Sequence, residues 1–219
     1  MASNLPPLIN KQVDPVHDRI YLSAGILIID PLHRSGIPHV LMSIQERARD
    51  HPRYILHLLG GAKSPQDRDC RETAFKHFYS KSGDLLDGSV FESFDEAYHN
   101  QNTVVLYYPP SKYLLFAIDI RWFSERDQDH IRDLPEDFNR KFPTPGSCDT
   151  DGLMWVNLEE FIQTCKSSFI LCKKKSLTVI DFPLSSSPSG AYGLSRFTTE
   201  IIGRNPVVEC FCDWFLSPR

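Results

Sequence analysis

A helix that lies between glycines is the strongest structural signal in this sequence. Residues 67–82 place four apolar side chains at helical spacing, on one narrow stripe: Cys70, Ala74, Phe75 and Phe78. Gly83 follows where a helix commonly ends on a glycine. Gly60 and Gly61 precede it, where they allow a positive φ angle or a close approach of two backbones. Two capping signals compete for the first turn of this helix, Ser64 to Asp67 and Asp69 to Glu72.

The rest of the sequence alternates short apolar runs with helical patterns. Strands are predicted at residues 20–29, 40–44 and 54–59, and a hairpin at residues 103–108 and 113–120. A further strand, near residues 152–156, runs into a helix capped by Asn157. This alternation predicts an α/β fold with a mixed sheet.

The two ends of the chain are less regular. Residues 1–18 contain three prolines and few bulky apolar side chains, so we expect an N-terminal arm before a domain that spans residues 19–219. A C-terminal extension of this domain begins after about residue 165. The segments expected outside the central pattern are a partly helical connection (125–150), a hairpin around three lysines (169–172 with 176–180) and two helices (197–202 and 206–215).

Composition restricts the classes of function. The chain has 219 residues, with 24 Lys and Arg against 28 Asp and Glu, and a formal net charge of −4, so it has no positive surplus with which to coat a nucleic acid. Hydrophobic content of 41% and charged content of 24% are close to globular averages. The apolar runs are far shorter than the roughly 20 residues that cross a bilayer, so no membrane anchor is expected.

The N-terminus and the cysteines predict an intracellular protein. The first residues lack the charged, apolar and small-residue pattern of a secretory signal, so we expect a cytoplasmic location. The six cysteines form no CxxC pair, which argues against a zinc site and a disulfide framework. We interpret them as reduced thiols, mostly buried.

The order of the elements resembles the Nudix hydrolase superfamily. The resemblance rests on Gly60-Gly61, Glu72-Thr73-Ala74, Gly83 and Trp155-Val156-Asn157-Leu158-Glu159-Glu160-Phe161, and it covers roughly residues 20–165. It implies a mixed β-sheet sandwiched between helices, with the conserved loop and helix of the family, the Nudix box, beside a cleft. Members of this family hydrolyse diphosphate compounds with the help of Mg²⁺, which takes hard oxygen ligands.

The Nudix box is degenerate in this chain. Counted back from Gly83, the family's Arg-Glu pair falls on Lys76-His77 and its Glu-Glu pair falls on Ser80-Lys81. Counted forward from Gly61, the Arg-Glu pair falls one residue earlier, so the loop length also departs from the family. The loss of carboxylates and the addition of positive side chains invert the local field. The usual metal cluster is therefore not expected. Mg²⁺ would need acids from elsewhere, namely Glu72 in the box helix and the acidic cluster after it, Glu92, Asp95 and Glu96, next to a short helix predicted at residues 94–100.

The side chains that replace the metal ligands suggest a different site. His77 and Lys81 are four residues apart and share a helix face, with Ser80 beside them, so this face could hold an anion without metal. A neutral His77 could act as a general base or acid near pH 7. Glu72, the one acid left on the box helix, is the second catalytic candidate. The alternatives are a solvated helix face and, for Glu72, a capping partner of Asp69.

Other candidates complete the predicted site for a small anionic ligand. Arg47 and Arg49 lie where the resemblance places cations near substrate phosphates, and arginine suits such contacts. Surface solubility explains these two residues equally well. The substrate-binding set is Arg47, Arg49, Gly60, Gly61, Lys76, Ser80 and Lys81.

Two hypotheses of function follow. The first is an enzyme that acts on a small anionic or diphosphate-containing metabolite with altered or absent metal dependence, for which a role in specialised metabolism would be suitable. The second is a catalytically inactive relative that serves as a ligand sensor or a protein-interaction module.

Overall fold

The computed structural model describes residues 8–47, 52–144, 146, 148–175, 179–182 and 192–216. The strands are β1 (Leu8–Asn10), β2 (Ser23–Asp30), β3 (His39–Glu46), β4 (Tyr54–His57), β5 (Leu59–Ala62), β6 (Thr103–Tyr108), β7 (Tyr113–Asp119), β8 (Gly152–Asn157), β9 (Val179–Phe182) and β10 (Tyr192–Ser195). The helices are α1 (Pro15–Ile20), α2 (Cys70–Lys81), α3 (Gly88–His99), α4 (Glu125–Lys141), α5 (Leu158–Lys175), α6 (Arg196–Ile202) and α7 (Asn205–Phe211). Short helical turns follow at Ile120–Trp122 (η1) and Cys212–Leu216 (η2).

The strands form one mixed sheet with β2 at its centre. The strand order is β1-β6-β7-β2-β3-β4-β10-β9, and β5 and β8 also pair with β2 and β3, respectively. β2 runs parallel to β7 and antiparallel to β5, with Gly25 of β2 opposite Gly60 of β5. β3 and β5 pair with the same edge of β2 at different places. β5 pairs with residues 23–26 of β2, and β3 pairs with Ile29 and Asp30 at the end of that strand. Gly25 therefore lies in the central strand of the sheet, and Gly60 lies beside it.

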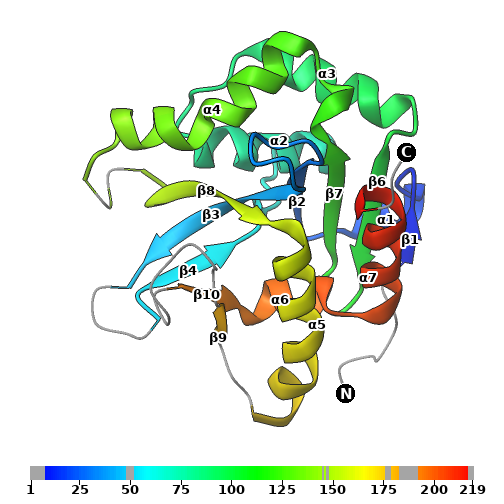
Figure 1. Cartoon of the computed structure of the whole chain (residues 1–219). Coiled ribbons are helices and arrows are strands. Elements are labelled where there is room, and N and C mark those ends of the chain that lie inside the picture. Colours follow the sequence, from blue (N-terminus) through cyan, green and yellow to red (C-terminus); the bar gives the residue numbers. More distant parts are fainter. Residues whose placement is uncertain are drawn as a thin grey trace.

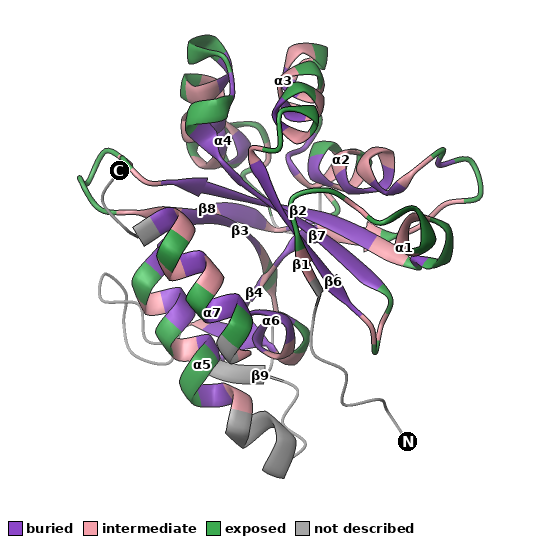
Figure 2. Cartoon of the chain, turned by 90° about the vertical axis from the view of Figure 1, so that its right-hand side faces the viewer, coloured by how far each residue is buried: buried purple, intermediate pink, exposed green. Residues whose placement is uncertain are grey.

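Helices cover both faces of the sheet, and this confirms the predicted α/β architecture. Figures 1 and 2 show α2, α3 and α4 on one side, and α5, α6 and α7 on the other. The residues of β2 alternate between the two cores: Ala24, Ile26 and Ile28 pack in the cluster that contains α2–α4, and Leu27 and Ile29 in the cluster that contains α5–α7. Burial on both faces explains why this strand is a continuous apolar run.

Helix α2 begins and ends as its flanking residues predict. Asp69 is the N-cap, and its Oδ1 accepts hydrogen bonds from the backbone N–H groups of Arg71 and Glu72, both at 2.9 Å. The segment from Ser64 to Asp67 forms a separate turn, in which the Ser64 N–H donates to Asp67 Oδ2 at 2.8 Å. Gly83 has a φ of +69° and, with Asp84, closes a Schellman motif on the last carbonyls of the helix.

Several other expectations are confirmed. The hairpin after α3 forms as β6 and β7, residues 125–150 contain α4, and the Glu160 N–H donates to Asn157 Oδ1 at 3.0 Å at the start of α5. The two C-terminal helices are α6 and α7. Cys70, Cys148, Cys165, Cys210 and Cys212 form no disulfide, but only two of these five, Cys70 and Cys165, are buried, fewer than expected.

One expectation is wrong. The first strand of the hairpin predicted around the three lysines is instead the C-terminal part of α5, and β9 pairs with β10. Helix α5 packs on the core through Phe161, Ile162 and Cys165 before it reaches this segment. At the other end, within the stretch expected as an arm, Leu8–Asn10 pairs with β6 and Asp14 caps α1.

The structure also bears on the membrane expectation. Within the described residues, no helix is both long and apolar enough to span a bilayer.

Candidate functional site

A pocket of about 240 Å³ lies beside Gly60 and Gly61, and we name it the glycine pocket. Its sheet side is formed by Ser23 of β2, by residues 57–58 and 60–62 around β4 and β5, and by Tyr113 of β7. Lys81, at the end of α2, and Ser195, Phe197 and Thr198, around the start of α6, complete the lining. The pocket thus brings together the end of α2 and the start of α6.

The glycines make room for a tyrosine at the bottom of the pocket. A Cβ atom on Gly25 would lie 2.1 Å from the Tyr113 hydroxyl oxygen, and one on Gly60 would lie 2.3 Å from it. Tyr113 is 3% exposed, and burial raises its pKa above the ordinary value, so its hydroxyl remains protonated. This hydroxyl has no hydrogen-bond partner among the described residues. It is a neutral donor that a ligand can use.

Lys81 and His57 supply the other polar groups. The Lys81 ammonium lies 3.5 Å from the Leu58 carbonyl oxygen. Burial lowers the pKa of Lys81, and the carboxylate of Asp149 partly opposes this effect. Burial, together with the positive charges of Lys81 and Arg47, lowers the pKa of His57 to about 4. His57 is therefore neutral at pH 7, and its Nε2 is buried without a hydrogen-bond partner in the described part of the chain.

The C-terminal extension supplies one wall of the pocket. Ser195 caps α6, and its hydroxyl lies 2.8 Å from the Thr198 hydroxyl. The Phe197 ring packs edge-on against Tyr113, with ring centroids 4.9 Å apart and an interplanar angle of 86°. Phe197 is 36% exposed, so one part of this ring contacts Tyr113 and another part meets solvent.

Of the residues predicted for the site, Gly60, Gly61 and Lys81 line this pocket. His77 lies next to it, on Gly61, and its Nε2 donates to the Ala62 carbonyl oxygen at 2.8 Å. Ser80 donates a hydrogen bond to Asp149, a carboxylate from the segment before β8 that the sequence did not single out. The catalytic role of His77 stays a prediction.

The remaining predicted residues lie elsewhere. Glu72 accepts hydrogen bonds from Arg68, at 2.7 Å from the backbone N–H and 3.1 Å from Nε. Lys76 contacts Asp67 at 3.3 Å. Both Glu72 and Lys76 line a separate, largely apolar groove between α2 and α3. Arg47 follows β3 and lies near enough to His57 to lower its pKa, and Arg49 is outside the described residues.

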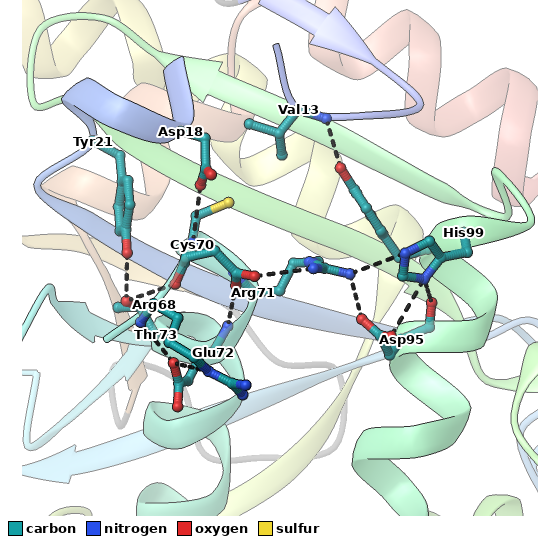
Figure 3. Close-up of polar contacts among 12 residues, drawn as sticks. Val13, Asp18, Tyr21, Arg68, Cys70, Arg71, Glu72, Thr73, Asp95 and His99 are labelled. Carbon is teal, nitrogen blue, oxygen red and sulfur yellow. Dashed lines mark hydrogen bonds and ion pairs between the residues drawn. The ribbon is translucent and has the colours of Figure 1, made fainter. Parts of the chain in front are cut away.

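Arg71, which precedes Glu72 in the sequence, links helices α2 and α3. Figure 3 shows its guanidinium beside Asp95 and His99 of α3. The same guanidinium donates to the Asp69 carboxylate at 2.9 Å. The Nδ1 of His99 lies 2.8 Å from the Asp95 carbonyl oxygen. Asp95 belongs to helix α3, as do Glu92 and Glu96, and α3 begins six residues before the short helix that the sequence predicted at residues 94–100. The Arg71 network ties α2 to α3.

Three of the four candidate acids have their contacts away from Ser80 and Lys81. Glu72 and Asp95 are engaged by arginines, and Glu92 lines the apolar groove. Among the described residues, no three His, Cys, Asp or Glu side chains are grouped so that they could hold a metal ion. At the family's Glu-Glu position the chain has a hydroxyl and an ammonium group, and Asp149 is the carboxylate bound there. This donor set fits Mg²⁺ poorly.

Several residues that line the pocket have no distinguishing signal in the sequence. His57 and Tyr113 lie in predicted strands, and Phe197 lies in a predicted helix, where each has an ordinary structural explanation. They become a site only because β4, β7 and α6 meet. An alignment of pocket-facing positions across the sheet would be needed to detect them, and a single sequence lacks that information.

Comparisons with known proteins add little. No protein-family model matches the chain, and no curated protein sequence matches it. Among solved structures, it is similar to the crystal structure of a Nudix hydrolase from M. smegmatis, RenU, at 16% sequence identity. The match covers 62% of this chain and 70% of that one, with a TM-score of 0.30. A similarity at this level carries no argument about substrate or catalysis.

Proposed function

We propose that this protein is a divergent Nudix-like protein whose glycine pocket binds a small anionic metabolite through Lys81, without the family's magnesium site. The single observation that carries the proposal is the position of Lys81. Its ammonium group lines a pocket at the place where the resemblance puts a metal-binding carboxylate. Among the described lining residues, Lys81 is the one that bears a charge at pH 7, since His57 is neutral.

The order of elements supports the Nudix part of the proposal. β5 carries the double glycine, α2 ends at Gly83 in a Schellman motif, and β8 runs into the capped helix α5. These features occur in the order that the sequence resemblance implies, and they bring the end of α2 beside a pocket.

Binding has two proposed consequences. The first is turnover of a small anionic or diphosphate-containing metabolite, with His77 as the proton acceptor. The second is sensing, without chemistry. The hydrogen bonds of His77 to Ala62 and of Glu72 to Arg68 favour sensing, because both predicted catalytic side chains already have partners in the fold. A role in specialised metabolism and a cytoplasmic location stay predictions from the sequence.

The test combines binding and product formation. Melting temperatures would be recorded with inorganic phosphate, pyrophosphate, prenyl diphosphates, NADH and ADP-ribose, each with EDTA and with Mg²⁺, and release of phosphate or monophosphates would be followed in parallel. We expect at least one anion to raise the melting temperature equally in both buffers, because a ligand that binds the native state stabilises it. Product that forms in EDTA would favour turnover. An unchanged melting temperature with every anion, or stabilisation that requires Mg²⁺, would contradict the proposal.

Lys81→Met tests the residue directly, with Lys141→Met as its matched control. Lys141 also donates to a backbone carbonyl, that of Gly83 at 2.8 Å, but it does not line the pocket. We expect the Lys81 variant to lose at least tenfold in affinity and the Lys141 variant to bind as the wild type does. Equal affinity of both variants would remove Lys81 from the site.

A further inference from the structure

The size of the glycine pocket restricts which ligands it can bind. The volume of about 240 Å³ is below the roughly 300–1,000 Å³ typical of pockets for drug-sized ligands. A pocket below this range favours a compact ligand over one of nucleotide size.

The charges near the pocket favour a ligand with a single negative charge. Lys81 is the one charged group among the described lining residues. Arg47 and Asp149 act on the pocket from outside its lining, and their charges are opposite. A diphosphate would leave at least one negative charge in a half-buried pocket without a partner, and such burial is costly.

The neutral groups indicate how the ligand is oriented. The Tyr113 hydroxyl donates but has no acceptor, and the His57 Nε2 is buried without a partner, in the described part of the chain. The Ser195 and Thr198 hydroxyls are already bonded to each other. Lys81 and Tyr113 both line the pocket, and a carboxylate has two oxygens that accept hydrogen bonds from donors such as these. Leu58, Ala62 and Phe197 then offer apolar surface to the rest of the molecule.

We propose, on the basis of the proposed function, that the ligand is a compact monocarboxylate with an apolar body, and that Phe197 limits its size. Lys81 and Tyr113 bind the carboxylate, and Phe197 packs against the body. Because the Phe197 ring is held by its edge-on contact with Tyr113, the group that binds the carboxylate and the group that limits the body are in direct contact.

The experiment measures binding of benzoate, benzamide, pyrophosphate, ADP-ribose and 2-naphthoate by calorimetry and by thermal shift. We expect benzoate to bind at least tenfold more tightly than neutral benzamide and than pyrophosphate. Lys81→Met should remove this preference for benzoate over benzamide. Tyr113→Phe should lower the affinity for benzoate by about tenfold, as expected for the loss of a hydrogen bond to a charged group. The Lys141→Met control should bind benzoate as the wild type does.

Phe197→Ala tests the size limit. We expect the wild type to bind 2-naphthoate at least tenfold more weakly than benzoate, and Phe197→Ala to reverse this order. Because Phe197 is partly exposed, the variant is expected to fold, and its melting temperature without ligand checks this. If naphthoate and benzoate bind equally to both proteins, Phe197 does not limit the size.

The outcomes separate this inference from the proposed function. If pyrophosphate or ADP-ribose binds and benzoate does not, the proposal of a monocarboxylate ligand is wrong, and the proposal of anion binding through Lys81 stands. If no anion binds, both are wrong. If benzoate and benzamide bind equally, the pocket recognises an apolar body without its charge, and the carboxylate contact is overturned.

Discussion

The imidazole of His77 lies directly on the backbone of Gly61. A Cβ atom at position 61 would be 2.3 Å from His77 Cε1, and the His77 Nε2 lies 2.8 Å from the Ala62 carbonyl oxygen. The sequence suggested either a positive φ angle or a close approach at Gly61, and the structure shows a close approach, by the His77 side chain. Helix α2 packs against β5 with no side chain of residue 61 between them.

Gly61→Ala should destabilise the protein. The added methyl group would overlap the His77 ring, and overpacking of this kind costs about 1–3 kcal/mol of unfolding free energy. Urea unfolding measures the difference. Gly88→Ala is the control, because a Cβ there meets nothing within 4 Å and alanine suits a helix. Equal stability of Gly61→Ala and the wild type would mean that His77 does not occupy this position.

Asp69→Ala should remove the N-cap of α2. The Asp69 carboxylate accepts hydrogen bonds from two backbone N–H groups and pairs with Arg71, so we expect a loss of about 1–2 kcal/mol. Chemical denaturation would measure it. The control is Asp129→Ala, since that side chain is 78% exposed and its change should stay within about 0.5 kcal/mol. A similar effect of both variants would argue against the cap.

His57 should make stability depend on pH between 7 and 4. Its pKa of about 4 in the folded protein lies below the ordinary value of about 6.5, so the unfolded chain binds more protons in this range. Lowering the pH therefore favours unfolding, by up to about 3 kcal/mol from this residue. Unfolding free energies measured from pH 7 to 4 should fall more steeply for the wild type than for His57→Gln, which has no imidazole to protonate. An NMR titration of His57 with a midpoint near 6.5 would contradict this.

Asp67 should act at lower pH. Burial alone would raise its pKa, but hydrogen bonds from the Ser64 N–H, the Thr73 hydroxyl and Lys76 outweigh burial and hold the pKa below its usual range. The stability that this carboxylate contributes is therefore present above about pH 4 and is lost as the pH falls through its folded-state pKa. Asp67→Asn should be less stable than the wild type at pH 6, and the two should converge near pH 3. A difference in unfolding free energy that is independent of pH would show that the charge of Asp67 is not involved.

The local elements were predictable because their signals lie within a few residues of one another. The cap at Asp69, the glycine at position 83 and the apolar stripe between them define α2 from adjacent positions. The hairpin of β6 and β7 is similarly local. The segment after Phe169 was assigned wrongly, because a short apolar run before three lysines fits a strand as well as a helix, and only packing against the core distinguishes them.

The glycine pocket was predictable only in part. Gly60, Gly61 and Lys81 could be named because the family resemblance assigns positions to them. His57, Tyr113 and Phe197 could not, since each is far along the chain from Lys81 and has no unusual sequence context. Glu72 and Lys76 were grouped with Lys81 as residues of one helix, but they line a different groove.

The sequence alone determined the alternation of strands and helices and the glycine-bounded helix that carries Lys81, because these depend on residue type and spacing within one element. The tertiary structure decided which side chains face the same pocket, since β4, β7, α2 and α6 are brought together only when both faces of the sheet are buried. It also decided that Lys81 and His57 are half-buried there, and burial lowers the pKa of both.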